Sequence, residues 1–102
     1  MILMTFVKAC GVNDIKPGHG KVVNIDGVEI AMFNLDGQFH AMDNACPHRH
    51  GPLGEGMVDD GEVTCPLHGW RFDIRTGKGV LMPVAVKTFH TKVEGHDVLV
   101  DV

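Results

Sequence analysis

The pair Asp-Gly constrains the fold of this chain more than any other sequence feature. Asp26-Gly27 and Asp36-Gly37 each separate two short apolar runs. Both residue types tolerate the left-handed backbone that a two-residue β-hairpin turn requires. Asp60-Gly61 and Glu94-Gly95 repeat the pattern less strictly. The chain is therefore expected to fold back on itself repeatedly as antiparallel hairpins.

Short β-type runs lie around these turns, and helical periodicity of useful length is absent. The expected strands cover residues 5–10, 21–25, 28–35, 38–43, 62–66, 84–94 and 97–102. They predict an all-β fold, a small antiparallel sandwich or barrel of about eight to ten short strands. The length of 102 residues suits one domain over residues 1–102.

Residues 44–80 depart from this rhythm, because they contain three prolines and seven glycines. Two compact motifs fall inside this region, Cys46-x-His48 and Cys65-x-x-His68. A loop-rich subdomain that carries a site and is inserted in a rigid β scaffold is the expected arrangement.

Two thiolates and two imidazoles suit either zinc or an iron–sulfur cluster. Classical zinc sites pair cysteine with cysteine and histidine with histidine at short spacings, whereas each motif here supplies one of each. That mixture matches common zinc sites poorly. His50 follows His48 by two positions and competes with it as a ligand.

The string CPHRHGPLGEG…VTCPLHGWRFDIRTG resembles the Rieske [2Fe–2S] signature, Cys-x-His followed by Cys-x-x-His. The resemblance extends over most of residues 28–102 and implies one cluster per chain. It implies that Cys46 and Cys65 hold one iron. His48 and His68 would hold the other, which favours His48 over His50.

The resemblance also indicates a branch of the family. Respiratory Rieske proteins carry two extra cysteines, joined by a disulfide, where this chain has Gly51 and Leu67. They also carry a serine and a tyrosine where this chain has Trp70 and Phe72. Hydroxyl hydrogen bonds to the cluster sulfurs raise the potential, so their loss implies a potential at the lower end of the Rieske range.

These departures make the chain similar to the ferredoxins of bacterial aromatic-ring dioxygenase systems. The resemblance implies a one-electron carrier between a flavin reductase and a terminal oxygenase. With 102 residues the chain is too short for an oxygenase catalytic domain as well, so it is not expected to be an enzyme. The small subunit of assimilatory nitrite reductase is the alternative. A structural zinc module with an interaction surface is the alternative from another class.

Composition excludes other classes of function. The formal charge is -4 and no basic run is present, which argues against nucleic acid as a partner. No apolar stretch reaches the length of a membrane span, so a cytoplasmic protein, working as a monomer, is expected. Cys10 is the odd cysteine of three and is expected to be a buried thiol in or just after a strand.

Overall fold

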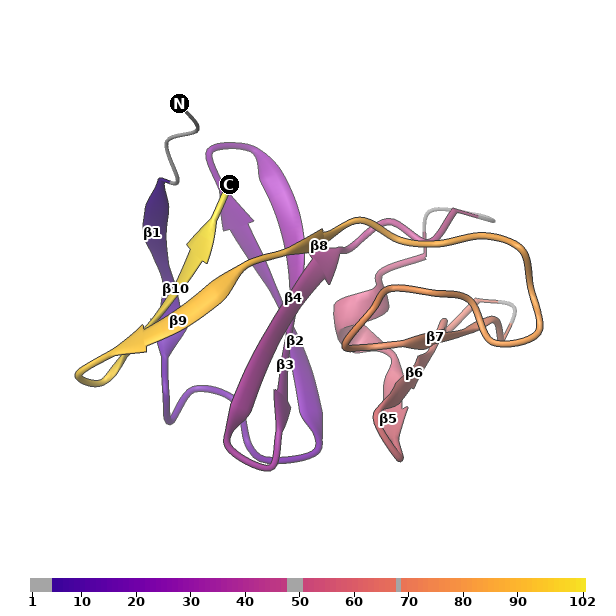
Figure 1. The fold of residues 1–102 in the computed structure, drawn as a ribbon, viewed down its shortest axis with the longest axis horizontal. Coiled ribbons are helices and arrows are strands. Elements are labelled where there is room, and N and C mark those ends of the chain that lie inside the picture. Colours follow the sequence, from indigo (N-terminus) through magenta and orange to yellow (C-terminus); the bar gives the residue numbers. More distant parts are fainter. Residues whose placement is uncertain (1–4, 48–50, 68) are drawn as a thin grey trace.

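The computed structural model describes residues 5–47, 51–67 and 69–102 (Figure 1). Within these ranges it contains ten strands and one turn of 3-10 helix. The elements are β1 (Phe6–Gly11), β2 (His19–Ile25), β3 (Val28–Leu35), β4 (Gln38–Asp43), η1 (Leu53–Glu55), β5 (Met57–Asp59), β6 (Glu62–Thr64), β7 (Arg71–Asp73), β8 (Thr88–Phe89), β9 (Thr91–Glu94) and β10 (Asp97–Asp101). The prediction of an all-β fold is confirmed.

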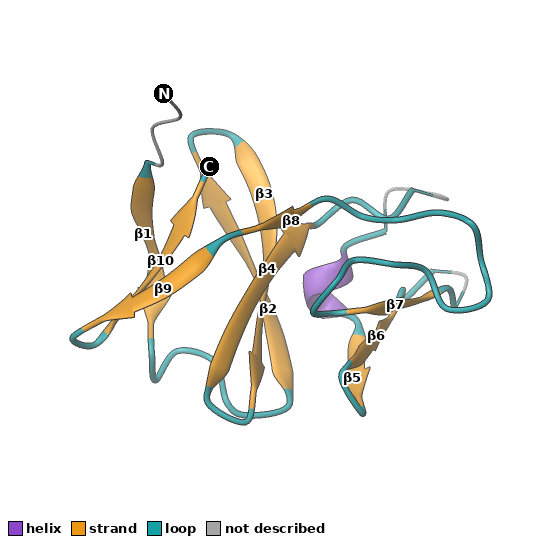
Figure 2. Ribbon diagram, viewed as in Figure 1, coloured by secondary structure: helices purple, strands orange, loops and turns teal. Residues whose placement is uncertain are grey.

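The strands form three antiparallel sheets that follow one another across the molecule (Figure 2). Their strand orders are β1-β10-β9, β2-β3-β4-β8 and β5-β6-β7. The first two sheets pack together at one end, and the small third sheet lies at the other end with η1 and the long loops (Figure 1). The site-bearing loops therefore extend from one side of a β sandwich.

The Asp-Gly turns explain why the hairpins form where they do. At 26–27, 36–37 and 60–61 the aspartate has a φ of 51° to 57° and the glycine a φ of 77° to 93°. Two successive positive φ values characterise the type I′ turn, whose twist matches that of antiparallel strands. The pairs 26–27 and 36–37 join β2 to β3 and β3 to β4, and the pair 60–61 joins β5 to β6. The hairpin predictions are confirmed.

Strand β3 separates two hydrophobic cores, because both of its faces are buried. Ile30 and Met32 point into the core of the sandwich, while Ala31, Phe33 and Leu35 point into the core shared with the third sheet. Cys10 also lies in the sandwich core, 5% exposed, as expected of a buried thiol. Burial, and then the Asp14 carboxylate, raise the pKa of that thiol.

The expectation of one strand over residues 84–94 is wrong. The segment forms β8, which pairs with β4, and β9, which pairs with β10 in the other sheet. His90 lies between the two strands and accepts a backbone hydrogen bond from Asp101. The alternation of apolar and polar residues continues where the chain passes from one sheet to the other, so periodicity alone does not reveal the change of sheet.

His40, on β4, is a partly buried titratable group that lines a hollow with Ile74 and Arg75, the residues after β7. Its Nε2 is covered and has no hydrogen-bond partner within the described ranges. Burial lowers the pKa of His40 and the nearby Arg75 cation lowers it further, while Asp73 opposes both effects. The folded chain therefore binds a proton at His40 less readily than the unfolded chain does.

We expect this histidine to make the fold less stable in mild acid. The unfolded chain takes up a proton near the ordinary histidine pKa of about 6.5, and the folded chain only at lower pH. The unfolded state thus binds more protons in that window, so stability falls as pH falls from about 7 through the folded-state pKa. His40→Gln should flatten the dependence of the melting temperature on pH between 7.5 and 5.5. Equal slopes in wild type and His40→Gln would contradict this account.

Candidate functional site

The first cysteine loop begins directly after β4. The Cys46 amide donates to the Gly51 carbonyl at 3.0 Å, which closes a loop of six residues, and Ala45 forms an isolated β-bridge with Pro52 beneath it. Cys46 is 0% exposed. This hydrogen bond fixes the backbone position from which the Cys46 side chain projects.

Asn44 anchors this loop to η1. Its side chain is buried, and its Oδ1 accepts a hydrogen bond from the Gly54 amide at 2.8 Å. Its carbonyl accepts another from the Leu53 amide at 2.8 Å. A buried amide satisfied in this way stabilises the position of the two residues that follow it. Sequence reasoning did not identify Asn44, although a polar residue two positions before a candidate ligand could have indicated it.

The second cysteine loop has the same construction and follows β6. The Cys65 amide donates to the Trp70 carbonyl at 2.7 Å, and the Gly69 amide donates to the Cys65 carbonyl at 3.1 Å. In both loops, a cysteine amide is therefore bonded to the carbonyl five residues later. Gly69 has a φ of 75°, a conformation that glycine adopts without strain. Two equivalent loops each present one buried cysteine.

Gly51 brings the two loops into contact. A Cβ atom added to Gly51 would lie 2.8 Å from Cys65 Sγ and 3.0 Å from Leu67 Cγ. The residue that closes the first loop thus lies directly against the second loop. The pair Gly51 and Leu67, predicted to stand where respiratory Rieske proteins have a disulfide, are indeed neighbours.

Both cysteines belong to the core below the loops. They share it with the fully buried Leu53 and Phe72, and Trp70 packs against its edge. The two sulfurs are buried in apolar surroundings, and the two loops are in contact at Gly51. This arrangement fits a group held by soft thiolate ligands. Among the described residues no group of three or more histidine, cysteine or carboxylate side chains could hold a metal ion. His48, His50 and His68 lie outside the described residues, so the histidine half of the predicted ligand set does too.

A third loop closes the same end of the molecule. The Gly79 amide donates to the Val84 carbonyl at 2.8 Å, and the Val80 amide donates to the Arg71 carbonyl at 2.9 Å. Met82 and Val84 pack against the core that holds the two cysteines. This loop is therefore bound to β7 and, through β7, to the second cysteine loop.

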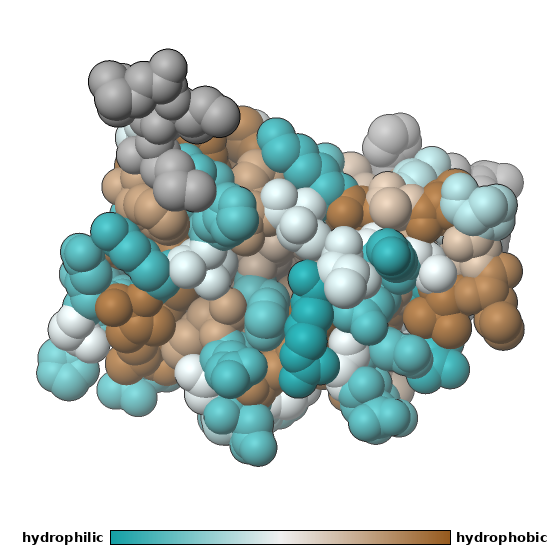
Figure 3. Space-filling model, viewed as in Figure 1, coloured by the Kyte–Doolittle hydropathy of each residue, from teal (hydrophilic) through white to brown (hydrophobic). Residues whose placement is uncertain are grey.

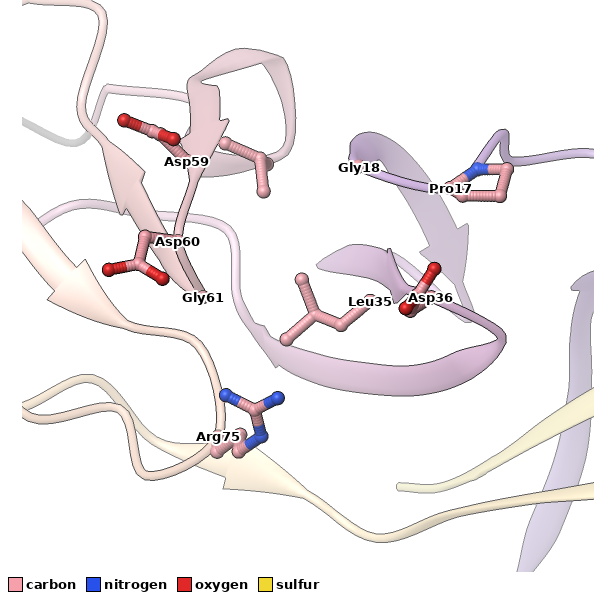
Figure 4. Close-up of a pocket in the computed structure, with 9 residues that line it drawn as sticks. Pro17, Gly18, Leu35, Asp36, Asp59, Asp60, Gly61 and Arg75 are labelled. Atoms are coloured by element: carbon pink, nitrogen blue, oxygen red, sulfur yellow. The ribbon is translucent and has the colours of Figure 1, made fainter.

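A groove of about 550 Å³ lies at the turn end of the β5–β6 hairpin (Figure 4). Asp59 and Asp60 line one side and Asp36 the other, and the Arg75 guanidinium points into the space between them. Cys65 follows the opposite end of the same hairpin. The groove therefore lies apart from the cysteine loops and supplies no side chain to them.

Comparison with known proteins agrees with this geometry. A family model described as "Rieske [2Fe-2S] domain" matches residues 5–95. The biphenyl dioxygenase ferredoxin subunit of Pseudomonas sp. (strain KKS102) is 43% identical over 101 residues, which are 96% of this chain and 93% of that protein. The match covers both proteins almost from end to end.

Solved structures give the same result. The ferredoxin of carbazole 1,9a-dioxygenase from Nocardioides aromaticivorans IC177 superposes with a TM-score of 0.88 at 31% identity, covering 95% of this chain and 97% of that one. A chain from a complex of reduced oxygenase and oxidized ferredoxin in carbazole 1,9a-dioxygenase gives a TM-score of 0.87 at 31% identity, covering 94% of this chain and 92% of that one.

A nitrite reductase relative has the same fold. A putative NADH-dependent nitrite reductase small subunit from Mycobacterium tuberculosis gives a TM-score of 0.89 at 27% identity, covering 97% of this chain and 96% of that one. Fold similarity alone therefore does not separate the two classes, whereas the higher sequence identity favours the dioxygenase ferredoxins. In the part of the chain that the structure describes, no helix has the length and apolar character needed to cross a membrane.

Proposed function

Because this chain belongs to the Rieske [2Fe–2S] domain family, we propose that it is the ferredoxin component of an aromatic-ring dioxygenase system. The cofactor is a Rieske [2Fe–2S] cluster, and the chain is an electron carrier rather than a catalytic subunit. One observation carries the proposal most strongly. Each of two loops is closed by a hydrogen bond from a buried cysteine's amide to the carbonyl five residues later, and the loops meet at Gly51.

The proposed ligands are Cys46 and Cys65 on one iron, and His48 and His68 on the other. The burial and contact of the two cysteine loops support the sulfur half of this set. The histidine half rests on the match between the Cys-x-His and Cys-x-x-His spacing and the family signature. We also propose that residues 1–102 form a single Rieske domain in which residues 44–80 are the cluster-binding subdomain.

Residues around the two cysteines would determine the surroundings of a bound cluster. A bound [2Fe–2S] cluster supplies a centre that accepts and releases one electron. Leu53 and Phe72 exclude water from below the cysteines, because both are fully buried. Gly51 leaves the space that Cys65 Sγ needs. A centre held by these two loops would lie at the end of the molecule that carries the third sheet (Figure 1).

The proposed partners are a flavin-dependent reductase as electron donor and a terminal oxygenase as acceptor. Two of the relatives named above are ferredoxins of dioxygenase systems, and one neighbouring structure is a complex of an oxygenase with a ferredoxin. We propose that the chain works as a cytoplasmic monomer. Sedimentation of the purified holoprotein at a mass of a single chain would support the monomer.

Two measurements test the function. The purified chain should be red-brown, bleach on reduction with dithionite, and contain two irons and two acid-labile sulfides, as one [2Fe–2S] cluster requires. After reduction it should pass electrons to the terminal oxygenase of the biphenyl dioxygenase system of strain KKS102. A colourless protein with one zinc would instead support the interaction module. Transfer to a nitrite reductase and not to the oxygenase would support the small-subunit alternative.

We expect a midpoint potential at the lower end of the Rieske range, near about −150 mV rather than +300 mV. Trp70 and Phe72 stand where hydroxyl-bearing residues donate hydrogen bonds to sulfur in respiratory Rieske proteins. Without those donors the more negative, reduced state is stabilised less. A redox titration followed by visible absorption measures the potential, and a strongly positive value would contradict the prediction.

A further inference from the structure

Leu81 is the most exposed large apolar side chain in the described part of the chain. It is 101% exposed, compared with 77% for Met57 on β5 and 54% for Leu67 in the second cysteine loop. Its φ of 66° is left-handed, a conformation that leucine adopts rarely and at a cost in stability. Two independent features of Leu81 therefore cost stability: the exposure of its side chain to water and its left-handed backbone conformation.

The loop around Leu81 holds that conformation in place. The Gly79–Val84 hydrogen bond closes the loop, and the Val80–Arg71 hydrogen bond ties it to β7. A Cβ atom on Gly79 would lie 2.8 Å from the Val84 carbonyl oxygen, so the two sides of the loop are in close contact. Backbone strain persists only where the surroundings determine the conformation, and such sites are concentrated at functional positions.

The position of the loop relates it to electron transfer. It is bonded to Arg71, which directly follows Trp70, the residue that closes the second cysteine loop. Figure 3 shows apolar side chains gathered at this end of the molecule, over the loop between β7 and β8. A partner that approaches the cysteine loops therefore meets an apolar surface.

We propose that Leu81 is the anchor by which this chain docks on its terminal oxygenase, inserting into an apolar hollow of that protein. This inference rests on the proposed function. The oxygenase is chosen over other occupants because a 31% identical ferredoxin structure comes from a complex with an oxygenase. Apolar anchors in fitted pockets carry much of the affinity of an interface. Because two hydrogen bonds already hold the loop backbone, ordering that backbone on binding costs little further conformational freedom.

The test separates docking from folding. Leu81→Gly removes the side chain and relieves the left-handed strain, so we expect a melting temperature higher by roughly 2 to 8 °C. The same variant should require about ten- to a hundredfold more protein to half-saturate its reduction of the KKS102 biphenyl oxygenase, followed by stopped flow. Its midpoint potential should not change. Leu81→Met, which keeps an apolar side chain, should remain within about threefold of wild type.

Val93→Ala is the matched control, because Val93 is also an exposed apolar residue, 50% accessible, but lies on β9 in the sheet at the other end. It should leave oxygenase reduction unchanged. Wild-type affinity in Leu81→Gly would overturn the proposal. Weakened reduction by the flavin reductase alone, or loss of a wild-type dimer, would also overturn it in favour of another occupant. Failure of the wild type itself to reduce the oxygenase would count against the proposed function instead.

Discussion

Replacing either proposed histidine ligand by alanine should abolish the cluster, while replacing the neighbouring histidine should not. We expect His48→Ala and His68→Ala to give colourless protein without iron or acid-labile sulfide, because three ligands cannot complete two iron sites. Cys46→Ala and Cys65→Ala should do the same. Visible absorption together with iron and sulfide analysis per chain measures the outcome.

His50→Ala and Cys10→Ala are the matched controls. His50 is the alternative ligand two positions after His48, and Cys10 is a cysteine buried in the core of the β sandwich. Both variants should keep the colour and two irons per chain. A colourless His50→Ala protein beside a red-brown His48→Ala protein would reverse the ligand assignment.

Among the glycine-to-alanine replacements in this chain, Gly77→Ala should cause the largest loss of stability. Its φ is 78°, and an added Cβ atom would lie 2.1 Å from the Val86 carbonyl oxygen. The Val86 amide also donates to the Gly77 carbonyl at 2.7 Å, so neither backbone can move freely. Strain and overpacking together should cost about 3 kcal/mol. In a domain of this size that lowers the melting temperature by roughly 12 to 24 °C.

Gly18→Ala separates the two causes. Gly18 has a similar φ of 81°, but nothing lies within 4 Å of an added Cβ atom. It should therefore show the backbone strain alone, about 1 kcal/mol or roughly 4 to 8 °C. Thermal unfolding of the holoproteins, followed by far-UV circular dichroism, gives the comparison. Equal losses of melting temperature in Gly77→Ala and Gly18→Ala would show that the backbone at Val86 moves aside without a cost in stability.

The sequence was informative wherever a feature depends on neighbouring residues. The hairpins at 26–27, 36–37 and 60–61 follow from the conformations that aspartate and glycine tolerate, and all three formed as expected. The sequence also indicated that Cys46 and Cys65 belong to one site, and the structure places both in the same hydrophobic core. Their role as ligands of one iron remains a prediction. The choice of His48 over His50 remains a prediction.

Features that depend on contacts between distant segments were not predictable. Residues 84–94 are divided between two sheets because β8 pairs with β4 and β9 pairs with β10. The alternation of apolar and polar residues is the same in both halves, so it does not reveal the division. Asn44 and Gly77 are single polar or small residues whose roles arise only from the segments packed against them.

For this protein, the sequence by itself determined the all-β class and the turns, since these depend on local conformation and on residue type. The ligand set Cys46, His48, Cys65 and His68 remains a prediction from the spacing of those residues. Only the tertiary structure decided that Gly51 lies against Cys65, and that Leu81 is held outward in a left-handed conformation. Both depend on long-range hydrogen bonds and close contacts. Leucine in a sequence predicts burial, and only the hydrogen-bonded loop around Leu81 shows that this leucine is exposed.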